Sequence, residues 1–182
     1  MRGVRLPKEL QEAVEKTIPV DYLGWDFSGY HLQGTKLPGN LDGCDFTDTI
    51  LCGLVEYSVR RITLLGPSFS KEQLVSTRSF NEKKIAHVRF EGKPPDTPEA
   101  DFTGLDFSGF DLTGTHFARN LKGINLTNAV ITSGDFSRAT NLTLDQIKST
   151  WNYKTGNMEG VILPKEIQEV LEAERQAKEE LP

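Results

Sequence analysis

The chain has 182 residues, enough for one domain or two small ones, and 37% of them are hydrophobic. Its net charge of −5 at pH 7 argues against non-specific nucleic-acid binding and leaves no basic patch for a membrane surface. Two cysteines are too few for a disulfide framework, and no apolar run approaches the length of about 18 residues that a membrane-spanning helix needs. Because no signal-like apolar segment follows Met1, we expect a soluble cytoplasmic protein.

Residues 1–19 are predicted to form a short strand and then a helix. Pro7 suits the first turn of that helix, and the apolar residues that follow fall on one stripe. Leu10 and Val14 lie on this stripe and are candidate interaction residues. The helix is predicted either to cover the end of the fold or to bind a partner.

Two arrays, at 20–58 and 100–142, repeat a large apolar residue every five positions, with one step of four. A helix has a period of 3.6 and a strand a period of 2, so neither explains this spacing. Short β-segments joined by tight turns do explain it, with the large residue facing inward and a recurrent glycine supplying the positive φ of a type II turn. The predicted core residues are Phe27, Leu32, Leu41, Phe46, Phe102, Phe107, Leu112, Leu121, Leu126 and Phe136.

The two arrays are copies of one unit. The motif DFSG occurs at Asp26 and again at Asp106, and the step of four falls at the matching place in both arrays. Coincidence is a poor explanation for both matches, so we interpret the chain as an internal duplication.

This pattern resembles the pentapeptide-repeat family. The resemblance is carried by the central Phe or Leu, the Asp or Asn before it, and the Thr, Ser or Gly of the turn, as in DFTG at Asp101. It implies an all-β solenoid, a right-handed quadrilateral β-helix that would run through the chain as one continuous body. It also implies one possible activity, because some members of the family mimic DNA and bind type II topoisomerases.

Segments 59–99 and 143–182 interrupt the arrays with predicted helices. Ser70 with Gln73, and Thr143 with Gln146, have the spacing of a capping box at a helix start. Each helical excursion is followed by a predicted re-entry strand, His87–Phe90 in the first copy and Gly160–Leu163 in the second. A Pro-rich linker then follows the first strand, and a C-terminal helix follows the second.

The C-terminal helix carries the second set of candidate interaction residues. Ile167, Val170 and Leu171 form its apolar stripe. The stripe is predicted either to fold back as a cap on a monomer or to remain available. In the second case it would pair with a partner protein or with a second copy, giving a homodimer through the terminal helices.

The sequence contains no motif that indicates catalysis. HExxH, CxxC, GxSxG and phosphate-loop patterns are missing, and the histidines are scattered. The repeated aspartates are interpreted as an outward-facing ladder. We therefore expect no enzymatic activity, no cofactor, no metal, and no direct contact with nucleic acid or membrane. The leading hypothesis is a non-enzymatic scaffold that binds an unknown protein partner; the alternative is a DNA mimic that binds a type II topoisomerase.

Overall fold

The structure, a computed structural model, describes residues 21–37, 39–52, 54–56, 59–61, 63–66, 68–92 and 101–179. The predicted N-terminal strand and helix, with Leu10 and Val14, lie outside the described residues, as does the Pro-rich segment 93–99. No helix in the described part of the chain is both long enough and apolar enough to span a membrane.

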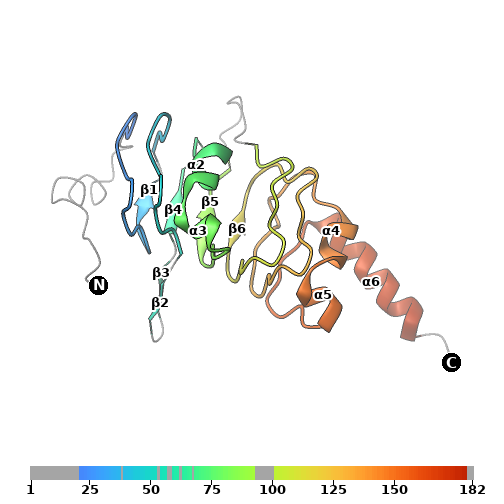
Figure 1. The fold of residues 1–182 in the computed structure, drawn as a ribbon. Helices are drawn as coiled ribbons and strands as arrows, with labels where there is room; N and C mark the ends of the chain where they lie inside the picture. Colours follow the sequence, from blue (N-terminus) through green and yellow to red (C-terminus); the bar gives the residue numbers. More distant parts are fainter. Residues whose placement is uncertain are drawn as a thin grey trace.

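A parallel sheet of four short strands, in the order β1-β4-β5-β6, runs through the middle of the molecule (Figure 1). A separate antiparallel hairpin, β2–β3, projects from one side of it. The strands are β1 (Lys36–Leu37), β2 (Leu54–Glu56), β3 (Val59–Arg61), β4 (Thr63–Leu65), β5 (Val88–Phe90) and β6 (His116–Phe117). The helices are α2 (Lys71–Ser76), α3 (Arg78–Asn81), α4 (Leu144–Lys148), α5 (Trp151–Thr155) and α6 (Lys165–Glu179).

The prediction of an all-β solenoid, a right-handed quadrilateral β-helix, is wrong. The described residues form five helices beside a small sheet of four short parallel strands. The periodic segments contribute single parallel bridges, such as Asp106 to Asn125. With a turn every five residues, too few extended residues remain for the long ladders of an all-β fold. The chain is a mixed α/β structure.

The repeated Asp and Asn residues shape the turns of the arrays. The side chain of Asp26 accepts a hydrogen bond from the backbone N–H of Ser28 at 2.8 Å, and Asp106 accepts one from Ser108 at 2.9 Å. Such a bond fixes the backbone two residues on and favours a tight turn. Gly109 follows Asp106 in the same repeat with φ of +68°, a conformation that glycine adopts without steric cost. The acidic ladder therefore has a structural role that the sequence pattern did not reveal.

The residues predicted for the core lie inside the molecule, where their exposed fractions are between 0% and 1%. Their rings and those of neighbouring segments stack from one turn of the chain to the next. Phe90 lies 5.3 Å from Phe117, and Phe117 lies 5.3 Å from Phe136, measured between ring centroids. A single hydrophobic core thus extends through both arrays and the segment between them.

The two capping boxes are confirmed. Ser70 begins α2 and Thr143 begins α4, each with its side chain bonded to the N–H of the glutamine that reaches back to it. Each glutamine also anchors its helix to the array before it: Gln73 Nε2 donates to the carbonyls of Leu41 and Cys44, and Gln146 Nε2 makes the matching pair of bonds. The excursions are therefore attached to the arrays through these glutamines, which are the third residues of α2 and α4.

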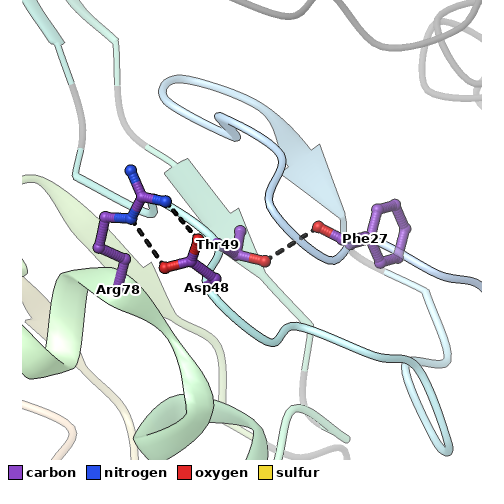
Figure 2. Close-up of polar contacts among 4 residues, drawn as sticks. All are labelled: Phe27, Asp48, Thr49 and Arg78. Carbon is purple, nitrogen blue, oxygen red and sulfur yellow. Dashed lines mark hydrogen bonds and ion pairs between the residues drawn. The ribbon is translucent and has the colours of Figure 1, made fainter.

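Figure 2 shows a further attachment of the first excursion, in which Arg78 forms an ion pair with Asp48 at the start of α3. The neighbouring Thr49 is buried and its hydroxyl donates to the carbonyl of Phe27 at 3.0 Å. The predicted re-entry strand of the first copy is confirmed as β5. That of the second copy is not a strand, because only Ile162 forms a bridge there, to Asp135.

Candidate protein-binding groove

An apolar groove of about 450 Å³ lies at the C-terminal end of the molecule, beneath α6. Its apolar residues come from α5, from the segment after α5 and from α6: Tyr153, Met158, Val161, Leu163 and Leu171. Its polar rim consists of Gln168, Glu172, Glu174 and Arg175, all on α6. An apolar floor inside a polar rim is the usual composition of a protein-binding surface.

α6 is placed over this end of the molecule by short-range and long-range contacts. Pro164 precedes the helix, and its carbonyl accepts the first hydrogen bonds, from the N–H groups of Ile167 and Gln168. The Gln168 side chain donates to the carbonyl of Leu163 at 2.7 Å, which holds the first turn of the helix against the segment before it. Ile167 is 8% exposed and belongs to the hydrophobic core.

An ion pair ties the outer part of α6 to α4. Lys148 Nζ lies 2.7 Å from Glu174 Oε1, and the two side chains are 32% and 36% exposed. The hydrogen bond to Glu174 raises the pKa of Lys148. Because both groups remain in contact with water, the pair holds α6 in place only weakly.

The structure separates the three predicted interaction residues of α6. Ile167 is buried in the core, Leu171 is half-buried and lines the groove, and Val170 is 46% exposed and lies outside it. Sequence reasoning missed the groove residues that precede the helix. A signal for them was present, because Met158, Val161 and Leu163 occupy the positions that Ile85, Val88 and Phe90 occupy in the first copy.

A second, smaller site contains an ion pair between a histidine and an acid. His116 Nδ1 lies 3.4 Å from Asp135 Oδ2, and Arg89 and Arg138 line the same hollow. Burial opposes ionisation of Asp135, but hydrogen bonds from Ser137 and the nearby His116 outweigh it and lower the pKa. The hollow has a volume of only about 20 Å³, too small for a substrate.

The two cysteines have structural surroundings. Cys44 is buried and its thiol donates to the carbonyl of Tyr22 at 2.9 Å, while the thiol of Cys52 donates to the carbonyl of Lys84 at 2.6 Å. Burial raises the pKa of both thiols, which disfavours the reactive thiolate. Within the described ranges, no three His, Cys, Asp or Glu side chains come together in a group that could hold a metal ion.

Comparison with known proteins found no relative of this chain. No family model matches the chain, and neither a curated protein nor a solved structure matches it. The resemblance to pentapeptide-repeat proteins therefore remains a prediction, and a functional proposal has to rest on the groove itself.

Proposed function

We propose that the protein is a non-enzymatic scaffold that binds a protein partner in the groove beneath α6. The observation that carries the proposal is the groove of about 450 Å³, with apolar side chains on its floor and charged side chains on its rim. Aromatic and methionine side chains are enriched in such binding surfaces, and Tyr153 and Met158 lie in the groove.

The groove suits a partner that inserts apolar side chains. The side chains of Met158, Val161 and Leu171 are partly exposed there, so covering them would remove apolar surface from water. Glu172 and Arg175 on the rim offer one charge of each sign, which would orient the partner more than tighten its binding. Methionine adapts its shape to a neighbour, so the floor can adjust to the inserted group.

The alternative, a DNA mimic that binds a type II topoisomerase, has weaker support. Hydrogen bonds from Ser108 lower the pKa of Asp106, so this exposed carboxylate is ionised at neutral pH. Asp26 faces Asp45 in the first array, but in the second array Asp106 faces Asn125 and Asp111 faces Val130, so the negative charge does not continue from turn to turn there. A DNA supercoiling assay with a purified type II topoisomerase tests this alternative directly, because a mimic would inhibit it.

Affinity capture with matched variants tests the scaffold proposal. Leu171→Asp places a charge in the groove, whereas Val170→Asp changes the neighbouring exposed residue and serves as the control. We expect one protein from extracts of the source cells to be retained by the wild type and by Val170→Asp and to be lost with Leu171→Asp.

Circular dichroism establishes that each variant is folded before the capture is interpreted. If Leu171→Asp does not fold, Val161→Asp replaces it as the groove variant. Retention of the same protein by a folded groove variant and by the wild type would contradict the proposal.

A further inference from the structure

The internal duplication shows what covers the end of a repeat unit when another array comes after it. Thr77 and Thr150 are matched residues at the starts of α3 and α5, and each accepts a hydrogen bond from the N–H three residues on. When the two copies are aligned on this pair, the groove residues that precede α6 each have a counterpart in the first copy. The counterparts of Tyr153, Met158, Val161 and Leu163 are Phe80, Ile85, Val88 and Phe90.

In the first copy, these counterparts are covered by the first turn of the second array. The Phe80 ring lies 5.0 Å from that of Phe110, and the Phe90 ring lies 5.3 Å from that of Phe117. Backbone bonds join the same surfaces, since the N–H of Ile85 donates to the carbonyl of Asp111 at 3.0 Å. Ile85, Val88 and Phe90 have no exposed surface as a result. We call this contact the internal joint.

In the second copy, α6 takes the place of the missing array and covers the end incompletely. Met158 and Val161 are half-buried where Ile85 and Val88 are fully buried. Ile162 is 48% exposed, whereas its counterpart Arg89 belongs to β5 and pairs with β6. The groove occupies the space that an array fills in the internal joint.

At the opposite end of the described part of the chain, the first array matches the other half of such a joint. Trp25 and Tyr30 of the first array match Leu105 and Phe110 of the second. Leu105 is 4% exposed and Phe110 is 2% exposed, whereas Trp25 and Tyr30 are only half-buried, and Leu23 beside them is 59% exposed. Figure 1 places this first array and the helices α4–α6 at opposite ends of the molecule, so one chain cannot bring the two surfaces together.

We propose that the end formed by α5 and residues 158–163 binds the first array, residues 21–37, of a second copy of this chain. The contact is head-to-tail and reproduces the internal joint, with Tyr153 against Tyr30 in place of Phe80 against Phe110. This inference goes beyond the proposed function, because the contact uses only the surface that precedes α6, from which α6 itself has to move aside. Head-to-tail contacts join different surfaces of the two copies, so each added copy leaves one end of each kind free.

α6 controls access to this contact. It lies over the groove and has to move aside before an array can enter, and the Lys148–Glu174 ion pair and the Gln168 side chain hold it back. The new joint also lacks two polar contacts of the internal one. Lys71 and Lys83 donate to backbone carbonyls of the second array, at Thr103 and Ser108, and their counterparts are Leu144 and Gly156. We therefore expect the association to be weaker than the internal joint and to strengthen when α6 is loosened.

Sedimentation of purified protein at increasing concentration tests the association. In Lys148→Glu, a like charge beside Glu174 loosens α6, so the average mass should rise with concentration more steeply than in the wild type. A mass that stays at that of one chain, 20.3 kDa, for both proteins at every concentration would overturn the inference.

A mixing experiment in the Lys148→Glu background then tests the head-to-tail geometry. Tyr30→Asp disables the first array, and Met158→Asp disables the opposite end. Each variant alone should remain at the mass of one chain, and an equal mixture should reach twice that mass, because each supplies the surface that the other lacks. Trp25→Asp and Tyr153→Asp replace either variant if circular dichroism shows that it does not fold.

Two results of the mixing experiment overturn the geometry. One is a mixture that stays at the mass of one chain. The other is a dimer that survives Tyr30→Asp but not Met158→Asp, since that dimer joins two C-terminal ends. If either occurs while another protein is still captured through Leu171, the head-to-tail inference fails and the scaffold proposal stands. If no protein is captured through Leu171 either, both fail.

Discussion

The helix pairs α2–α3 and α4–α5 have the same local structure in different surroundings. Both pairs begin with a capping box. In each pair, a polar side chain accepts a hydrogen bond from the matching backbone N–H of the array before it. Ser79 Oγ accepts from the N–H of Leu51 at 2.7 Å, and Asn152 Oδ1 accepts from the N–H of Ile131 at 2.6 Å. The first pair is covered by an array, and the second pair is partly covered by α6.

The local sequence and the sequence that comes later in the chain control different properties of these helices. Caps and anchoring side chains lie within each excursion, so two related sequences produce two related helix pairs. The covering of their outer surface depends on the segment that comes next in the chain. An array comes after the first re-entry segment, whereas Pro164 and α6 come after the second. A groove therefore exists at only one of two otherwise similar places.

The largest expected loss of stability differs between the internal joint and the C-terminal groove. Phe90→Ala should lower the free energy of unfolding by about 3–5 kcal/mol, because it leaves a cavity among stacked rings. The matched variant Leu163→Ala should cost nearer to about 2 kcal/mol, since this side chain already borders the groove. Denaturant unfolding measures both values. Equal losses would show that the end of the second copy is as tightly packed as the internal joint.

Removal of the N-cap hydroxyl should cost the same stability in both copies. Ser70→Ala and Thr143→Ala each remove the hydroxyl of a capping box and should each cost about 0.5–2 kcal/mol. Denaturant unfolding of the two variants side by side gives the comparison. A loss at one cap without a loss at the other would contradict the view that the two excursions are locally equivalent.

A smaller effect is expected from the contact that only the second copy has. Lys148→Ala removes the ion pair with Glu174 and should lower the free energy of unfolding only slightly, because both side chains are partly exposed. The difference from the wild type should shrink as salt is added, since salt screens exposed charges. A loss that is insensitive to salt would indicate that Lys148 acts through packing instead.

The smallest expected effect is the pH-dependent contribution of Asp48, in the first copy, to stability. The hydrogen bonds and charge of Arg78 lower the pKa of Asp48 below its ordinary value of 3.8, whereas the matched residue of the second copy is Asn128, which does not titrate. A carboxyl with a lowered pKa in the folded state stabilises the fold above pH 3.8, and that contribution is lost as the pH falls through the lowered pKa.

Asp48→Asn should therefore make the first copy behave like the second. The variant should be slightly less stable than the wild type at neutral pH, and the difference should disappear in acid below pH 3.8. Denaturant unfolding across the acid range measures this, with Asp42→Asn as a control at an exposed acid that makes no ion pair with Arg78. A difference that grows in acid would contradict the assigned role of Arg78.

Features that depend on a few neighbouring residues could be predicted from the amino-acid sequence. The period of five identified the inward positions, such as Phe107 and Leu126, because a turn at fixed spacing returns every fifth side chain to the same side. The spacing of Thr143 and Gln146 identified a helix start, because a capping box is complete within four residues. Where such a short pattern was extended to the whole chain, as in the all-β solenoid, the extension failed.

The way in which the segments cover one another depends on long-range packing and could not be predicted from the sequence. The stripe of Ile167, Val170 and Leu171 was visible in the sequence, but a helix of known periodicity can still lie at many angles on a surface. Contacts of α6 with distant parts of the chain set that angle, mainly through the hydrophobic core and only weakly through the ion pair of Lys148 with Glu174. They bury Ile167, expose Val170 and leave Leu171 at the edge of a groove. The groove is thus a result of long-range packing, which no local pattern encodes.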